Sequence, residues 1–212
     1  MDNFINEYYF TEETQIKKTK AKKRQLVLLN TGCSIESHFI KITKRFNGKY
    51  TKIPTFTIDK SGKIYQHYDP LQYTQLIDNE DLSKQSIIIA LENLGWLNYD
   101  EKTSQYEDWM GVPYRFDVVE RAWRSKKYWA SYTNEQYLAL TELINYLCIE
   151  YSIDKNFVGS NIIINRANKI NGILTRSNFS KNHYDLTPAF DFEKLIELIN
   201  NWYEHSKRIR PN

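Results

Sequence analysis

Two short aliphatic runs stand out in the first half of the chain. Residues 26–29 lie between a basic stretch and Thr31-Gly32, and residues 87–91 form an almost continuous apolar run after a polar segment. Neither run alternates with polar residues, which is typical of strands covered on both faces of a sheet. The pattern therefore predicts two buried strands, the second of them central.

A β-hairpin is predicted between these two strands. Residues 55–58 and 63–66 are rich in β-branched and aromatic side chains, and the polar turn 59–62 separates them. Gly62 closes the turn, where its missing side chain permits a positive φ.

Three segments have the spacing of amphipathic helices. Apolar residues recur every three or four positions in 34–45, 133–150 and 191–203. The second segment begins with Thr133 and Gln136, the spacing of a capping box, in which side chains and backbone N–H groups exchange hydrogen bonds. Strands and helices in this order predict an α/β fold, with a mixed central β-sheet flanked by helices.

One domain accounts for most of the chain. We expect a basic N-terminal arm at residues 1–24, a single domain at 25–205 and a short tail at 206–212. Residues 96–132 are rich in Trp and Tyr without a clear period, which predicts a long irregular insertion of the kind that often carries function. Residues 161–164 are a candidate for a further short strand.

Composition and charge exclude some classes of protein. Hydrophobic residues make up 41% of the chain and aromatic residues 15%, which is too much for a disordered protein. The net charge of +3 indicates no nucleic-acid partner. The basic run at 17–24 either contacts an anionic polymer or keeps the following strand soluble, and the second interpretation is favoured. We find neither a signal peptide nor a membrane span, so we expect synthesis in the cytoplasm.

Several segments together resemble one family, the zinc-dependent N-acetylmuramoyl-L-alanine amidases related to peptidoglycan recognition proteins, and in particular phage-type members. Residues 25–32 resemble its first strand, which ends in His-His-Thr, and residues 55–66 resemble its hairpin, which ends in "DG-x-I-Y-Q". Residues 86–91, 132–137 and 172–188 resemble a later strand, the start of the long helix, and the segment "G-I-Y-T-H-S-N-Y" followed by "D-x-x-P". The resemblance implies an amidase-like fold for most of the chain.

The resemblance also assigns the positions of a zinc site. Family members cleave the amide between muramic acid and L-alanine with a zinc ion that activates water, while an acidic residue moves the proton. The first zinc His falls at Leu29, the second at Arg176 and the third ligand at Asp185. The catalytic Glu falls at Ala90. Only Asp185 suits its role, so the resemblance implies that the zinc has been lost and no cofactor is bound.

A protein-borne positive charge is expected where the zinc would lie. We predict that the Arg176 guanidinium pairs with Asp185 in a bidentate manner, because a lone buried carboxylate is costly. Leu29 then fills the remaining space. Glu92 lies two residues after Ala90, on the same face of the strand, and is a further candidate for the cleft.

Other residues offer alternative sites. A competing alignment places the second zinc His at Ser160, which also lacks a suitable donor. His183 and Asp185 form either a metal-binding pair or a surface polar pair, and the second is favoured. His67 either lines the cleft or lies in a partly exposed loop, and the loop is favoured. The remaining histidines are expected at the helix surface: His38 and His205.

Two further features have competing interpretations. Cys33 follows the first strand, but no His can be assigned as its base, so packing is favoured over a nucleophilic role. The aromatic residues of the insertion, among them Trp96 and Trp109, form a local core, a protein interface or a surface that stacks on sugars. The local core is the favoured interpretation.

These observations predict a catalytically inactive amidase-like protein that is reused as a binding or structural module, with a phage particle among the assemblies considered. Its partners are expected to be proteins of a larger assembly or peptidoglycan. The alternatives are a peptidoglycan-binding protein that uses the old cleft, and an active amidase with an unforeseen metal site. The binding candidates are Arg176, Asp185, Glu92, His67, Trp96 and Trp109.

Overall fold

A six-stranded mixed sheet forms the centre of the protein. The computed structural model describes residues 5, 7–8, 15–159 and 162–202. All neighbouring strands of this sheet are parallel except the β3–β4 pair, so the expected mixed sheet is confirmed. In spatial order the strands are β1 (Glu7–Tyr8), β4 (Ile64–Gln66), β3 (Phe56–Ile58), β5 (Ser86–Leu91), β2 (Gln25–Asn30) and β11 (Gly172–Thr175).

The two aliphatic runs form the middle of this sheet, as predicted. Strand β5 lies between β3 and β2, and every residue of β5 is buried. The predicted hairpin is formed by β3 and β4, and Gly62 has a φ of +83°. A Cβ at Gly62 would lie 2.8 Å from the Glu135 carbonyl oxygen, so close packing as well as backbone conformation requires glycine there.

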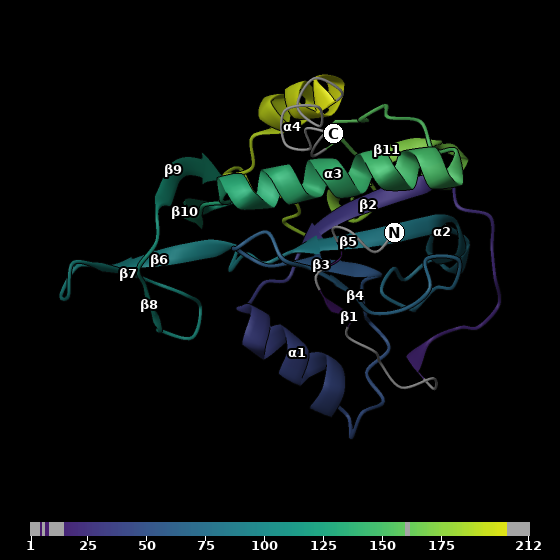
Figure 1. Cartoon of the computed structure of the whole chain (residues 1–212). Helices are drawn as coiled ribbons and strands as arrows, with labels where there is room; N and C mark the ends of the chain where they lie inside the picture. The colour runs from purple at the N-terminus through teal and green to yellow at the C-terminus, as the bar shows by residue number, and fades with distance from the viewer. Residues whose placement is uncertain (1–4, 6, 9–14, 160–161, 203–212) are drawn as a thin grey trace, which may run out of the picture.

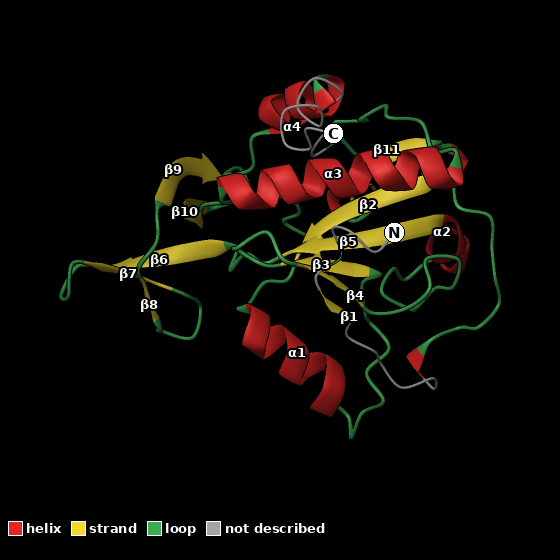
Figure 2. Cartoon of the chain, viewed as in Figure 1, coloured by secondary structure: helices red, strands yellow, loops and turns green. Residues whose placement is uncertain are grey.

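A second sheet replaces the irregular insertion that the aromatic segment suggested. Five antiparallel strands project from the end of the central sheet (Figure 2). Tyr106 packs between Tyr99 and Tyr128, with ring centroids 5.0 Å from each. The prediction was wrong because these aromatic residues form cross-strand pairs. In spatial order the strands are β8 (Pro113–Tyr114), β7 (Gln105–Glu107), β6 (Trp96–Asp100), β10 (Lys126–Ala130) and β9 (Val118–Trp123).

Helices cover both faces of the central sheet (Figure 1). Helices α3 (Asn134–Tyr151) and α4 (Phe192–Asn200) lie on one face, while α1 (Ile35–Lys44) and α2 (Glu80–Gln85) lie on the other. The predicted capping box of α3 is present, and Ser34 caps α1. Helix α2 was not predicted. None of the described helices has the length and apolar character needed to cross a membrane.

The two faces of the sheet have separate cores. Leu26 and Leu28 face α3, whereas Val27 and Leu29 face α2 and the loops around it. Because side chains alternate along a strand, the two strand positions assigned to the zinc site, Leu29 and Ala90, share the α2 face. On that face Leu29 pairs in register with Ala90.

Two local expectations were wrong. Residues 162–164, the described part of the expected strand at 161–164, lie in a loop where the Ile164 N–H donates to the Asn178 carbonyl at 2.8 Å. Lys23, expected in a solvated basic run, is only 2% exposed and donates to the Gln72 and Lys84 carbonyls at 2.8 Å each. In both segments the hydrogen bonds are to residues far away in the sequence, which local composition does not indicate.

Candidate functional site

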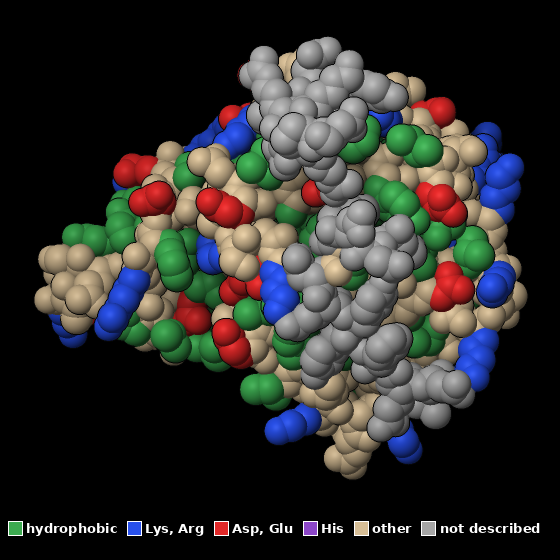
Figure 3. Space-filling view, viewed as in Figure 1, with side chains coloured by type: hydrophobic (Ala, Val, Ile, Leu, Met, Phe, Trp, Pro, Cys, Tyr) green, Lys and Arg blue, Asp and Glu red, His purple; other side chains and the backbone are tan. Residues whose placement is uncertain are grey.

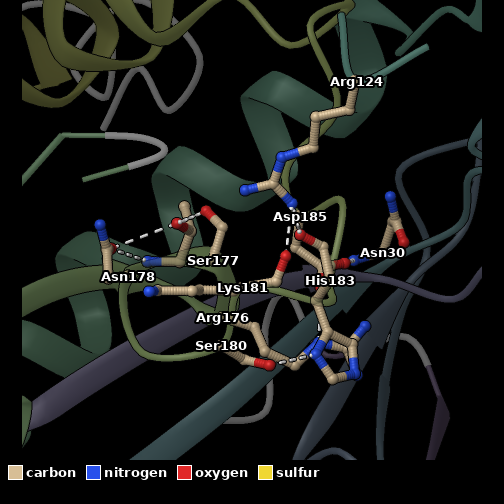
Figure 4. A network of polar contacts seen from close by, with 10 residues as sticks. Asn30, Arg124, Arg176, Ser177, Asn178, Ser180, Lys181, His183 and Asp185 are labelled. Carbon is tan, nitrogen blue, oxygen red and sulfur yellow. Dashed lines mark hydrogen bonds and ion pairs between the residues drawn. The ribbon is translucent and has the colours of Figure 1, made fainter. Parts of the chain in front are cut away.

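An ion pair between Arg176 and Asp185 lies at the centre of the candidate site (Figure 4). Arg176 begins a short 3-10 helix (Arg176–Asn178) directly after β11, and its Nε lies 2.5 Å from Asp185 Oδ2. The other carboxylate oxygen accepts the Asn30 N–H at 2.9 Å. The expected pair is therefore present, but not as a bidentate pair, because each oxygen takes a separate donor. The hydrogen bond from the Asn30 N–H was not predicted, because any residue other than proline can supply a backbone donor.

This ion pair is largely buried, so its partners matter for stability. The side chain of Asp185 is 1% exposed and that of Arg176 is 19% exposed. A carboxylate removed from water is costly unless it has charged or hydrogen-bonding partners, and Asp185 has one of each. Each carboxylate oxygen of Asp185 thus already accepts a hydrogen bond from a protein donor.

Leu29 and Ala90 stand at the other two positions that the family resemblance assigns to metal chemistry. They are 3% and 0% exposed, respectively, and pack in an apolar cluster with Ile77 and Leu82. Neither side chain has an atom that can donate a lone pair or accept a proton. Within the described residues, no three His, Cys, Asp or Glu side chains are grouped so that they could hold a metal ion. The residues present therefore do not fit a zinc ion.

Glu92 braces two neighbouring segments. Its Oε1 accepts the Ile35 N–H at 3.1 Å at the start of α1, and its Oε2 accepts the Lys60 N–H at 2.9 Å in the β3–β4 turn. Both carboxylate oxygens thus hold backbone donors. The structure gives Glu92 a positioning role at the end of β5.

His67 and His38 form a buried cluster with Thr57. The Thr57 hydroxyl lies 2.8 Å from His67 Nε2 and 3.2 Å from His38 Nε2, and the two histidines are 1% and 5% exposed, respectively. Burial, followed by the charges of His67 and Lys41, lowers the pKa of His38 to about 3. The expected surface position of His38 is therefore wrong. His67 follows β4 in a loop, as expected, but it is buried rather than partly exposed. His38 has polar neighbours in the sequence, but helix α1 packs it against the sheet. The helical pattern alone did not indicate this.

His183 and Asp185 have separate partners, and the favoured surface pair is wrong because Asp185 is buried. His183 Nδ1 lies 2.6 Å from the Ser180 hydroxyl, while Asp185 is engaged by Arg176. Burial, together with the Arg176 charge, lowers the pKa of His183. Arg124, from the turn of the second sheet, donates to the His183 carbonyl at 2.8 Å and so ties this loop to that sheet (Figure 4). The alternative positions Ser160 and His205 lie outside the described residues.

A pocket of about 480 Å³ opens beside the ion pair. Three segments line it, 76–82 before and within α2, 163–168, and 176–183 after β11. Arg176 and Arg166 supply positive charge, and the remaining wall mixes apolar side chains such as Leu82 and Ile164 with polar ones such as Asn79 and Asn168. Sequence reasoning missed Arg166 and the pocket, because the three segments meet only through the fold.

The aromatic candidates divide between core and surface. Trp129 is fully buried, which supports a local core, whereas Trp109 is 59% exposed in the turn between β7 and β8. Trp96 is half-buried, with Lys126 Nζ 3.3 Å from its ring centroid. Cys33 is half-buried, and burial raises the pKa of its thiol, which disfavours a reactive thiolate.

The sequence and fold comparisons identify the family. The family profile described as N-acetylmuramoyl-L-alanine amidase matches residues 19–182, so the chain belongs to this family of amidase-like proteins. A search of curated proteins gave no significant match.

Solved structures show the same fold at low sequence identity. The amidase LysC from Clostridium intestinale has a TM-score of 0.53 at 14% identity, covering 91% of this chain and 97% of LysC. PlyL has a TM-score of 0.55 at 9% identity, covering 91% and 95%. AmiD from E. coli, in complex with an anhydro-N-acetylmuramic acid peptide, has a TM-score of 0.50 at 15% identity, covering 85% and 59%. These identities establish similarity of fold alone.

Proposed function

We propose that this chain is a non-hydrolysing member of the amidase family that uses the fold as a binding or structural module. The observation that carries the proposal is the Arg176–Asp185 ion pair, because it stands where the family resemblance assigns two zinc ligands. A guanidinium stays protonated at physiological pH and has no lone pair to offer a metal.

The neighbouring positions support the same conclusion. Zinc hydrolysis needs about three protein ligands, a bound water and a group that moves the proton. Leu29 and Ala90 supply none of these functions, and Glu92 is engaged by two backbone donors. The residues at this site therefore stabilise the fold and shape a cleft.

Two kinds of partner are consistent with such a module. The segments on either side of β8 expose Trp109, Met110, Val112 and Phe116, each more than half exposed, and several hydrophobic side chains lie on the projecting sheet in Figure 3. Clustered exposed apolar residues are typical of binding surfaces. We favour a protein partner in a larger assembly such as a phage particle. Peptidoglycan is the second candidate, because AmiD binds a muropeptide with a related fold.

Metal analysis combined with a hydrolysis assay tests the proposal. Purified protein is incubated with zinc and desalted, and its zinc content and release of muropeptides from peptidoglycan are measured. We expect neither stoichiometric zinc nor release. The matched variant Leu29→His/Ala90→Glu/Arg176→His, which keeps Asp185, is expected to retain more zinc. One zinc per wild-type chain together with muropeptide release would instead establish an active amidase with an unforeseen metal site.

Sedimentation and co-purification distinguish the partners. Sedimentation with purified peptidoglycan would select the second candidate, whereas co-purification with virion proteins would select the first. Trp109→Ser is expected to weaken whichever interaction is found. Ile149→Ser serves as the control, because Ile149 is 66% exposed on α3, away from the second sheet.

A further inference from the structure

The pocket beside Arg176 has the dimensions of a small-molecule site. Its volume of about 480 Å³ lies within the usual range for such sites, roughly 300–1,000 Å³. It opens on the face of the central sheet that contains Leu29, and Arg176 lines it directly.

Arg176 is fixed in orientation by its buried partner. Nε donates to Asp185 Oδ2, and Asp185 is itself held by the Asn30 N–H. Among the described residues, none accepts a hydrogen bond from the two Nη atoms of Arg176. A planar guanidinium whose Nε edge is anchored presents its remaining donors in a fixed fork, and such a fork matches an oxyanion without further ordering cost.

The charges around the pocket leave a positive excess. Asp78 lies on the pocket wall, but it is paired with Lys52 at 2.9 Å, and Asp185 is paired with Arg176. Arg166 also lines the pocket and makes no ion pair within the described part of the chain. The pocket therefore favours a ligand that carries negative charge.

The rest of the wall indicates what else the ligand contains. Leu76, Leu82, Ile164 and Phe179 line the pocket beside the two arginines. They share the wall with polar side chains, among them Asn79, Asn165 and Asn168. Hydrocarbon buried against the apolar part of the wall leaves water, which favours an organic ligand over a hydrated inorganic anion.

We propose that this pocket binds a small organic carboxylate, with the carboxylate held by Arg176 and Arg166 and the apolar body packed against Leu82, Ile164 and Phe179. This inference rests on the proposed function, because Arg176 is available to an anion only where it has replaced a metal ligand. It assigns a ligand class to the pocket beside the Arg176–Asp185 ion pair.

Histidine NMR provides a local readout of binding. The chain contains four histidines, and His183 lines the pocket, so its ring signal, assigned with His183→Gln, reports on occupancy. N-Acetyl-leucine is expected to shift this signal in a saturable way. N-Acetyl-leucinamide, which lacks only the carboxylate charge, is expected to bind roughly tenfold more weakly or worse. Equal affinities for the acid and the amide would overturn the proposal, as would inorganic phosphate binding more tightly than N-acetyl-leucine.

Two variants test the arginines without leaving Asp185 unpaired. Arg166→Asn suits the backbone φ of 68° at this position, and Arg176→Lys keeps a cation beside Asp185 but loses the planar fork. Each is expected to weaken N-acetyl-leucine binding by roughly tenfold. Arg45→Gln, at a cation that stacks on Phe46 away from the pocket, is the control and should leave affinity unchanged. Unchanged affinity in both pocket variants would overturn the proposal.

The same titration in the presence of a metal chelator separates this inference from the proposed function. Failure of N-acetyl-leucine to bind zinc-free protein that also releases no muropeptides would remove the carboxylate site alone. Binding that appears only when zinc is added would contradict both.

Discussion

Replacing Arg176 with leucine tests how the buried carboxylate of Asp185 is stabilised. Asp185 is 1% exposed, and its donors are Arg176 Nε at 2.5 Å and the Asn30 N–H at 2.9 Å. Removing one partner of a buried ion pair leaves an uncompensated charge, which typically costs about 3–5 kcal/mol. Because Arg176 is 19% exposed, water can reach part of the site, and we expect a loss near the lower end of that range. Urea unfolding followed by circular dichroism measures it.

Two companion variants identify the origin of the loss. Arg176→Leu/Asp185→Leu removes both charges, so its main cost is the Asn30 N–H left without an acceptor, about 1–3 kcal/mol. The double variant is therefore expected to be more stable than Arg176→Leu alone. Lys52→Leu breaks the exposed pair with Asp78 and should cost less than about 1 kcal/mol. A loss for Arg176→Leu no larger than that of Lys52→Leu would refute the reasoning.

Three further predictions concern the framework. Burial lowers the pKa of His38 from 6.5 to about 3. Its contribution to stability is therefore complete above pH 6.5 and falls as pH drops toward 3, by about 2 kcal/mol at pH 5. The free energy of unfolding should fall less between pH 7 and pH 5 in His38→Gln than in the wild type. An equal fall in both proteins would contradict this role of His38. Gly62→Ala should cost about 1–3 kcal/mol, because its Cβ would lie 2.8 Å from the Glu135 carbonyl oxygen. Gly32→Ala, also at positive φ but with open space around it, should cost less in the same urea assay, and equal costs would exclude the clash. Thr133→Ala should lower the thermal midpoint through a loss of about 1 kcal/mol, and no change would show that the cap is dispensable.

The central sheet was predictable because its signals are local. The aliphatic runs at 26–29 and 87–91 are buried strands in the structure, and Thr133 and Gln136 form the capping box that their spacing indicates. In each case the residues that form the sequence pattern are also the residues that form the strand or the cap. Backbone pairing and capping then follow from patterns within a few residues.

The second sheet was not predictable in the same way. Tyr106 is stabilised by Tyr128, which lies on a strand more than twenty residues later, so the aromatic pattern has meaning only after the strands pair. His38 was misplaced for a similar reason. Its hydrogen-bond partner Thr57 lies on β3. The helical pattern around His38 does not indicate that its side chain will meet a buried hydroxyl on another element.

The candidate site was partly predictable. The Arg176–Asp185 pair followed from the family resemblance together with the cost of an isolated buried carboxylate, and the structure contains it. Its geometry did not follow, because the second donor is the Asn30 backbone N–H. The role of Glu92 could not be predicted from the sequence either. Its two carboxylate oxygens accept hydrogen bonds from segments that meet only in the folded protein.

Anomalous X-ray diffraction at the zinc absorption edge, on crystals soaked in excess zinc, tests the central claim most directly. We expect no anomalous peak within coordination distance of Asp185, about 2.0–2.2 Å for a zinc-bound carboxylate oxygen, with Arg176 still seated on the carboxylate. A strong peak bound to Asp185, with the guanidinium displaced, would contradict the account of this fold as one that no longer hydrolyses through zinc.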